Sequence, residues 1–407
     1  MTADADNANA GQPGNAQVLI VGAGPTGLAA AAELGRLGVS AEILERGDTI
    51  GAAWRSRYDR LRLNTHRRVS GLPGSKFPRG TPDYASRDQF VRYLDSYAER
   101  HHLRVRFGVR VDRVDPCADG WTLTTSAGPR TARQVIFTIG SLHTPVLPDW
   151  PQADKYPGII VHTAAYRNAS EFKDHDVLVV GAGCSATDIA CDLIEGGARR
   201  VRLAIRTQPN LMLRKIAGVI PGDLLMTVLF KVRPRIADTV ASLVRRTTIG
   251  NLAPWGLTPP AEGPFAAFAR TGKAPTFVDS QLLRAVRADR VEVVDGVAKV
   301  DGDAVELLNG ITLKPDSIIV ATGFCSGLEP IVGHLGVLDG DGMPKVHDGP
   351  AAAPGLRFFG YVLGLSTMGR RARDTMSQVS RELALGIPGP SPHRFPTQCG
   401  ASAGDGS

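Results

Sequence analysis

The chain has 407 residues, enough for two or three domains that each bury a core of their own. Hydrophobic residues make up 43% of it and charged residues 21%, which excludes a chain too polar to fold. The formal net charge of +7 is spread along the sequence, and so diffuse an excess gives no indication of a nucleic acid as partner.

Both ends of the chain differ in composition from the rest. Residues 1–16 are polar, lack the cationic start and apolar segment of a signal peptide, and predict a disordered leader. Proline and glycine dominate residues 387–407, which predicts a disordered tail. The five cysteines form no C-x-x-C pair and no metal-ligand spacing, so we expect a reducing compartment, the cytoplasm, and no metal site. No apolar run is long enough to predict a transmembrane segment.

The first folded elements are a strand, a glycine-rich turn and a helix. Residues 18–21 are all apolar, which predicts a buried strand, and small residues at 29–32 predict the helix. The turn between them has the spacing G-x-G-x-x-G and consists of Gly22, Gly24, Pro25, Thr26 and Gly27. Its first glycine allows a tight turn, its second lets a pyrophosphate approach the backbone, and its third lets helix and strand pack closely. This pattern predicts a dinucleotide site, with the phosphates at the helix N-terminus.

The next elements extend that first domain. A strand over 41–44 ends at Glu45, whose carboxylate could accept hydrogen bonds from both hydroxyls of a ribose. An amphipathic helix is predicted over 86–101, because four large apolar residues share one face: Phe90, Tyr93, Leu94 and Tyr97. Short strands are then predicted over 105–107, 109–114, 121–125 and 134–138. Prolines at 145, 148 and 151 mark a linker out of the first domain.

The strand, turn and helix then occur a second time, starting at residue 176. The candidate cofactor contacts in this turn are Gly181, Gly183, Ser185, Ala186 and Thr187. Ala186 takes the place of the third glycine and is small enough for the same packing role. The following strand, 201–205, ends in Arg206, whose guanidinium can bind a 2′-phosphate that an acid would repel. The second site therefore favours NADP(H) over NAD, unless Arg206 is a plain surface arginine.

The remaining sequence is mixed. Residues 211–246 are predicted to be helical, apolar on one side and basic on the other. Two interpretations stay open: an insert over 211–275 that walls the substrate route, or a helix on a membrane surface, a peripheral contact. Strand-rich sequence resumes at 291–308, and a strand that begins at 316 ends in the Ala-Thr-Gly of residues 321–323. A final helix is predicted over 375–385.

Several motifs together resemble the class B flavin monooxygenases, most closely the microsomal-type and plant YUCCA-type branch. The segment from Tyr156 to Tyr166 is similar to the family fingerprint F-x-G-x-x-x-H-x-x-x-[YF], with Tyr156 in place of the initial Phe. The strand-end Ala-Thr-Gly-Phe is similar to the family's A-T-G-[YF] segment. The segment that starts at Trp54 and the helical insert are similar to the same branch. With the two glycine turns, these motifs cover residues 17 to about 385.

The resemblance implies an α/β fold with two Rossmann-like dinucleotide-binding domains. FAD would bind the first turn and NADPH the second. The FAD-binding domain would be split into 17–150 and 316–386, with an NADP-binding domain inserted over 151–315. Further cofactor contacts are expected at Arg46, Trp54, Val111, Gly140, Thr322 and Gly323.

The resemblance also implies the reaction. NADPH would reduce the flavin, a flavin C4a-hydroperoxide would form with O2, and one oxygen atom would pass to a small organic substrate. N- or S-oxygenation and oxidative decarboxylation of a 2-oxo acid both stay open. Asn64 would lie beside the reactive edge of the flavin as the catalytic residue, and an ordinary loop asparagine is the alternative.

Some residues depart from the family pattern. Cys184 and Ala186 stand where the branch has Asn and Gly, and YUCCA-type enzymes often have His in place of Asn64, which argues against indole-3-pyruvate as substrate. Tyr166 disfavours a Baeyer–Villiger monooxygenase, where Trp would be expected, and the lack of a cysteine pair near the flavin excludes a disulfide reductase. An NADPH oxidase flavoprotein and a regulatory FAD-binding protein without oxygenase activity remain as alternatives.

Overall fold

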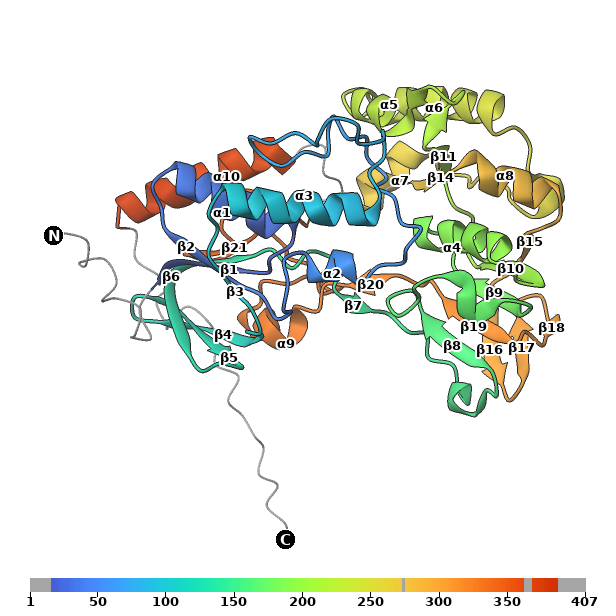
Figure 1. Ribbon diagram of the computed structural model, residues 1–407, viewed down its shortest axis with the longest axis horizontal. Coiled ribbons are helices and arrows are strands. Elements are labelled where there is room, and N and C mark those ends of the chain that lie inside the picture. The colour runs from blue at the N-terminus through green and yellow to red at the C-terminus, as the bar shows by residue number, and fades with distance from the viewer. Residues whose placement is uncertain (1–15, 273–274, 362–367, 387–407) are drawn as a thin grey trace, which may run out of the picture.

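The computed structural model describes residues 16–272, 275–361 and 368–386, so the predicted tail and, apart from Ala16, the predicted leader lie outside the described residues. Two sheets with parallel strands form the two halves of the molecule, and the predicted α/β fold class is confirmed (Figure 1). Each half begins with the strand, glycine turn and helix that the sequence indicates.

The first sheet has seven strands in the order β3-β2-β1-β6-β5-β4, with β21 paired beside β6. Its members are β1 (Ala16–Val21), β2 (Ala41–Leu44), β3 (Val105–Arg106), β4 (Val111–Cys117), β5 (Gly120–Thr125), β6 (Arg130–Phe137) and β21 (Leu356–Phe358). Val18 and Ile20 pack against the helices on one face, while Leu19 and Val21 contact the opposite core. Burial on both faces explains why β1 reads as a continuous apolar run.

Three helices cover one face of this sheet: α1 (Pro25–Arg36), α3 (Arg87–Arg100) and α10 (Met368–Ala384). The predicted amphipathic helix is confirmed as α3. Ser86 and Gln89 form a capping box at its start, and the four large apolar residues of its predicted face are buried. The final helix begins earlier than predicted, at Met368.

The second sheet has five parallel strands in the order β15-β10-β9-β19-β8. They are β8 (Ile159–His162), β9 (Asp176–Val180), β10 (Arg200–Ile205), β15 (Glu292–Asp295) and β19 (Ser317–Val320). Helices α4 (Cys184–Glu195) and α8 (Ser280–Arg287) cover one face. A ribbon covers the other and consists of β16 (Val297–Asp301), β17 (Ala304–Leu307) and β18 (Thr312–Leu313).

The predicted domain boundary at 316 is wrong. Strand β19 pairs with β9 and β8 in the second sheet, so the chain returns to the first half only after it. Ser317, Ile318, Ile319 and Val320 are fully buried, and such a run fits the centre of either sheet equally well. The sheet to which β19 belongs is decided by its pairing with β8 and β9, and the sequence pattern does not contain that pairing.

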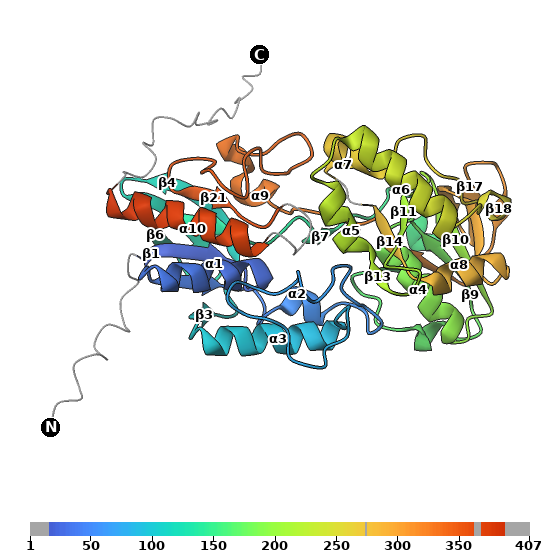
Figure 2. The same ribbon diagram turned by 90° about the horizontal axis from the view of Figure 1, so that it is seen from above.

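The helical prediction for 211–246 is only partly right. The segment begins with β11 (Leu211–Leu213), which pairs with β14 (Thr276–Val278), and with a hairpin of β12 (Lys215–Ile216) and β13 (Ile220–Pro221). Ala217 and Gly218 have positive φ angles and form the hairpin turn. Helices α5 (Gly222–Leu229), α6 (Pro234–Thr248) and α7 (Pro264–Thr271) follow, and they lie on the second half (Figure 2).

Short elements complete the fold. Helices α2 (Ala52–Arg55) and α9 (Glu329–Val332) belong to the first half, and four 3-10 turns lie at Ala153–Lys155, Ala169–Phe172, Ala253–Trp255 and Gly333–Leu335. Strands β7 (Thr144–Pro145) and β20 (Phe324–Cys325) pair antiparallel where the chain passes between the halves. Within the described ranges, every helix is too short or too polar to span a bilayer.

Candidate functional site

The first glycine turn leaves open space where a phosphate would approach. Gly22 has a φ of +108°, and a Cβ on Gly27 would lie 2.0 Å from the Gly22 carbonyl oxygen, so only glycine fits at these positions. A Cβ on Gly24 would meet nothing within 4 Å. Pro25 and Thr26 open α1, and no described side chain caps this helix. The turn therefore fits a pyrophosphate bound by backbone N–H groups.

Glu45 follows β2 at the same edge of the sheet and is 9% exposed. Its carboxylate oxygens accept hydrogen bonds from the backbone N–H groups of Ala23 (2.7 Å) and Gly47 (2.8 Å). These bonds hold the carboxylate against the turn, while each oxygen keeps a further lone pair. The arrangement leaves Glu45 able to accept a ribose hydroxyl.

The other predicted contacts of this half are spread around the turn. Arg46 is exposed. Burial, followed by the charge of Arg46, lowers the pKa of His143 to about 4. Gly140 follows β6 with a φ of +75°. Trp54 lies half-buried on α2, and Val111 is a buried residue at the start of β4. Glu45 is therefore hydrogen-bonded directly to the glycine turn. The other four predicted contacts lie further along the chain, around that turn.

Thr322 and Gly323 lie at the end of β19, between the two halves. The Thr322 hydroxyl donates to the Val146 carbonyl at 2.5 Å. The Gly323 carbonyl accepts from the His162 Nε2 at 3.1 Å, which fixes the tautomer of that ring. Thr322 and Gly323 therefore form hydrogen bonds that hold the chain where it passes between the two halves.

The second glycine turn repeats the geometry of the first. Gly181 has a φ of +135°, and a Cβ there would lie 2.4 Å from the Ala321 carbonyl oxygen. A Cβ on Gly183 would meet nothing within 4 Å, and no described side chain caps α4. Ala186 and Thr187 are buried against the sheet, and Ser185 is half-buried in the first turn of α4. This turn also fits a pyrophosphate.

Arg206 extends from the carboxyl end of β10, the strand next to the edge strand β15. It is exposed, and its Cβ packs against Gly296, where a second Cβ would come within 2.8 Å. Strand β10 lies beside β9, which leads into the second turn, so the exposed Arg206 side chain starts at the same edge of the sheet as that turn, where a 2′-phosphate could reach it.

A buried arginine joins the two halves of the molecule. Arg214 follows β11 and is 3% exposed. Its Nη2 donates to the Oδ1 of Asn64 at 2.9 Å, and its Nη1 donates to Asp279 at 2.5 Å. The same Nη2 lies 3.4 Å from Asp188 on α4. The predicted catalytic residue Asn64 is thus bonded to the half that contains the second turn.

Two tyrosines enclose this cluster. Tyr58 donates to Asp188 at 3.2 Å, and burial with the nearby Asp188 charge raises its pKa. Tyr84 donates to Asp223 at 3.2 Å and to the Arg214 carbonyl, and its ring centroid lies 5.9 Å from the guanidinium carbon. Burial and the nearby Asp223 charge also raise the pKa of Tyr84, so both phenols keep their protons at neutral pH.

Burial and neighbouring charges shift the pKa values of both Arg214 and Asp188. Burial lowers the pKa of Arg214, but the carboxylates of Asp188 and Asp279 more than compensate and raise it. Burial raises the pKa of Asp188, and Arg214 opposes that rise. Arg214 is therefore a permanent cation and the partner that allows a carboxylate to stay buried beside Asn64.

Sequence reasoning missed this cluster. Arg214 is one of several basic residues in a segment that the pattern predicts to be helical, and no sequence motif includes Asp188. The available signal was a charge at the end of the apolar run Leu211–Leu213, and an acid on the apolar face of α4. Such charges are buried only when paired.

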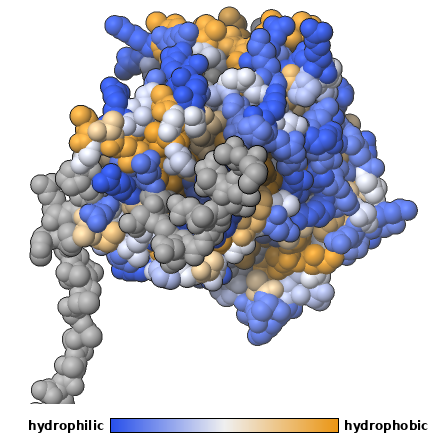
Figure 3. Space-filling view, turned by 60° about the vertical axis from the view of Figure 1, so that its left-hand side comes forward, coloured by the Kyte–Doolittle hydropathy of each residue, from blue (hydrophilic) through white to orange (hydrophobic). Residues whose placement is uncertain are grey.

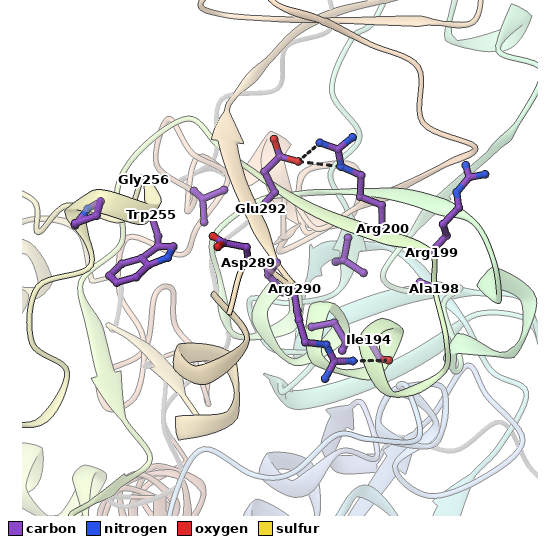
Figure 4. Close-up of a pocket in the computed structure, with 13 residues that line it drawn as sticks. Ile194, Ala198, Arg199, Arg200, Trp255, Gly256, Asp289, Arg290 and Glu292 are labelled. Atoms are coloured by element: carbon purple, nitrogen blue, oxygen red, sulfur yellow. Dashed lines mark hydrogen bonds and ion pairs between the residues drawn. The ribbon is translucent and has the colours of Figure 1, made fainter. Parts of the chain in front are cut away.

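A pocket of about 720 Å³ lies away from all of these residues. It is formed at the amino ends of β10 and β15, where Arg200 pairs with Glu292 at 2.6 Å across its wall, beside Trp255 (Figure 4). Dinucleotides bind outside the carboxyl ends of parallel strands. This pocket is at the opposite edge of the sheet and is not the cofactor site.

Comparison with known proteins places this geometry in a family. The family described as pyridine nucleotide-disulphide oxidoreductase matches residues 19–216. The chain is 33% identical over 330 residues to the probable indole-3-pyruvate monooxygenase YUCCA4 of Arabidopsis thaliana, with 80% of each chain covered. It is 33% identical over 314 residues to the indole-3-pyruvate monooxygenase YUCCA1 of Oryza sativa subsp. japonica, with 76% of this chain and 77% of the relative covered.

The chain belongs to the class B flavin monooxygenases. A flavin-containing monooxygenase from Stenotrophomonas maltophilia has the same fold, with a TM-score of 0.71 and 22% identity over 91% of this chain and 99% of that one. The cyclohexanone monooxygenase from Rhodococcus sp. Phi1 bound to NADP+ gives a TM-score of 0.69 at 18% identity, over 92% of this chain and 85% of that one.

This class B flavin monooxygenase is an FAD- and NADPH-dependent oxidoreductase, as the sequence predicts. The family description that mentions disulphides does not extend to its chemistry, because residues 19–216 contain no C-x-x-C pair. That match reflects the shared pair of dinucleotide folds.

The fingerprint of this flavin monooxygenase consists of packed residues. A Cβ on Gly158 would lie 2.2 Å from the Asp316 carbonyl oxygen, so glycine is required where β8 meets β19. Tyr156 donates to the Pro315 carbonyl, and Tyr166 donates to Asp192 at 2.6 Å. The fingerprint residues therefore pack where β8 and the segment after it meet the rest of the second half.

Arg206 offers a test of nucleotide choice in this monooxygenase. Replacing Arg206 with Gln is expected to lower kcat/KM for NADPH about 10–100-fold, because a charge-assisted bond to the 2′-phosphate would be lost. The value for NADH should change little. Arg104→Gln, at an exposed position in the other half, is the matched control. Equal effects on both nucleotides in steady-state kinetics would refute the assignment.

Proposed function

We propose that this monooxygenase uses NADPH and O2 to oxygenate a 2-oxo acid with loss of CO2. In this proposal FAD binds at Gly24 and Glu45, and NADPH binds at Gly183 and Arg206. The relatives named as indole-3-pyruvate monooxygenases support the substrate class. When bound, FAD supplies the redox and oxygen-transfer chemistry, so the protein needs no nucleophile or metal of its own.

The observation that carries the proposal is the position of Asn64. It belongs to the half that contains Glu45, yet it is bonded to Arg214, which pairs with Asp188 on α4, the helix that follows Gly183. Asn64 therefore lies on the contact between the two cofactor-binding halves, where hydride has to pass from one cofactor to the other.

The bond to Arg214 also orients the side-chain amide of Asn64. Arginine has only donors, so the atom that faces it is the Oδ1. The Nδ2 is then directed away from Arg214 and can donate to an oxygen-bearing group at the flavin edge. The buried cluster around Arg214 holds that donor in place and limits the access of water.

Substrate assays separate this proposal from its alternatives. The purified enzyme is first mixed with NADPH without air, and bleaching of the flavin absorbance is followed. It is then given air and one of four substrate classes: 2-oxo acids, amines, sulfides or cyclic ketones. Consumption of a 2-oxo acid with release of one CO2 per NADPH supports the proposal. N- or S-oxides, esters, or hydrogen peroxide alone would each overturn the substrate class, and failure to bleach would indicate a regulatory flavoprotein.

Asn64 can be tested by a change of one atom. Asn64→Asp keeps an acceptor for Arg214 but removes the N–H donor, so coupled oxygenation is expected to fall about 100-fold. NADPH should then be consumed mainly to form hydrogen peroxide, which a peroxidase assay quantifies. Asn309→Asp, in an exposed turn, is the control. If Asn64→Asp stays tightly coupled, the role assigned to Asn64 is wrong.

A further inference from the structure

The outer surface of the helical insert presents many exposed apolar side chains. We name this surface the insert face; it is formed by the β12–β13 hairpin, α5 and α6. Its apolar residues are between 36% and 78% exposed and comprise Val219, Ile220, Val228, Phe230, Val232, Ile236, Val240 and Leu243. Figure 3 shows orange apolar side chains along the top of the molecule, with blue hydrophilic ones beside them. Patches of this kind mark interaction sites.

Helix α6 has two apolar sides. Ala237 and Ala241 are buried on the side that packs toward α7. Ile236, Val240 and Leu243 follow one another at intervals of four and three residues, so they form a second stripe along the helix. This stripe is exposed in the described part of the chain and is not needed to hold α6 in place.

The charges of the insert face have one sign. Lys231, Arg233, Arg235, Arg245 and Arg246 lie on or beside α6, and none of them forms an ion pair with a described residue. The single acid between residues 224 and 248 is Asp238. Its carboxylate accepts from the backbone N–H groups of Phe265 (2.8 Å) and Ala266 (3.1 Å) at the start of α7. The acid is thus directed inward, and the cations remain outside.

We propose that the insert face docks on the surface of an anionic lipid bilayer. Exposed apolar residues on a hairpin tip and along a helix can enter the boundary between headgroups and acyl chains, while arginine and lysine contact lipid phosphates. A second copy of the chain is a poorer occupant, because a twofold contact would place like charges opposite each other. Charge complementarity therefore selects the lipid surface, and this inference is independent of the proposed substrate.

The test uses the full flavin-loaded enzyme and vesicles of phosphatidylcholine with or without phosphatidylglycerol. Sedimentation should show binding that requires the anionic lipid and weakens when salt shortens the Debye length. Ile236→Glu combined with Leu243→Glu is expected to weaken binding at least tenfold. Replacing Lys231, Arg233 and Arg235 by Gln is expected to weaken it roughly 100-fold.

Controls separate docking from misfolding and from self-association. Leu308→Glu combined with Ile311→Glu alters two equally exposed apolar residues on the β17–β18 ribbon and should leave binding unchanged. Flavin content and the thermal transition should be the same in all variants. No binding by the wild type, or equal binding to neutral vesicles, overturns the proposal. So does light scattering that shows a wild-type dimer which Ile236→Glu with Leu243→Glu makes monomeric.

Discussion

Replacing Gly24 with alanine is expected to weaken FAD binding without unfolding the protein. A Cβ at this position meets no atom of the protein within 4 Å, and Gly24 has a φ of −78°, which alanine readily adopts. The new methyl group would instead occupy the space left for the pyrophosphate. We expect FAD affinity to fall by more than about tenfold, a loss of over ~1.4 kcal/mol. Flavin fluorescence titration of the apoprotein measures it.

Gly183→Ala is the matched variant in the second turn. Gly183 has a φ of −81° and the same open space, and either change replaces a helix N-cap glycine, so both cost a similar amount of stability. Gly183→Ala should keep FAD and lose affinity for NADPH, seen as a raised KM. If Gly24→Ala retains FAD, or if each variant loses the other cofactor, the assignment of FAD and NADPH to the two turns is wrong.

Arg214→Met is expected to destabilise the protein and to uncouple it. Asp188 is buried, and without the guanidinium it becomes an uncompensated carboxylate, which costs about 3–5 kcal/mol. Asn64 also loses the partner that orients its amide. Denaturant unfolding measures the first effect, and hydrogen peroxide released per NADPH measures the second. Adding Asp188→Asn should restore part of the stability, because a neutral amide needs no counter-ion.

The variant Arg202→Met tests whether uncoupling comes from a misplaced Asn64 amide or from a general loss of stability. Arg202 is also buried and pairs with Asp176 and, at 3.2 Å, with Glu292, but it lies in β10 away from Asn64. It should lower stability without raising peroxide release. Arg214→Lys keeps the charge but loses the planar fork, so it should uncouple more than it destabilises. Equal uncoupling in Arg202→Met and Arg214→Met would refute a positioning role for Arg214.

The sequence predicts those elements whose structure depends on residues that lie close together in the chain. The two glycine turns are such a case, because Gly22 and Gly181 require positive φ and Gly27 requires close packing within a few residues. The helix capped by Ser86 is another, since cap and apolar face lie in one short segment. These features follow from backbone geometry and periodicity, which a single chain carries in full.

The missed features depend on distant residues. Asn64 and Arg214 are separated by 150 positions, and no local pattern relates an amide in one loop to a cation after β11. The sheet that receives β19 is decided by pairing with β8 and β9 rather than by its own four residues. Burial of a charge becomes visible in the sequence only where it interrupts an apolar run, as Arg214 does.

Strands β7 and β20 belong to the two chain connections between the halves, and they pair with each other. The two connections therefore lie side by side, so the chain joins the halves at one place. Asn64 lies in one half and Arg214 in the other, with 2.9 Å between the Oδ1 of Asn64 and the Nη2 of Arg214. Any separation of the halves would lengthen this bond, so the orientation of the Asn64 amide would report whether the halves are together.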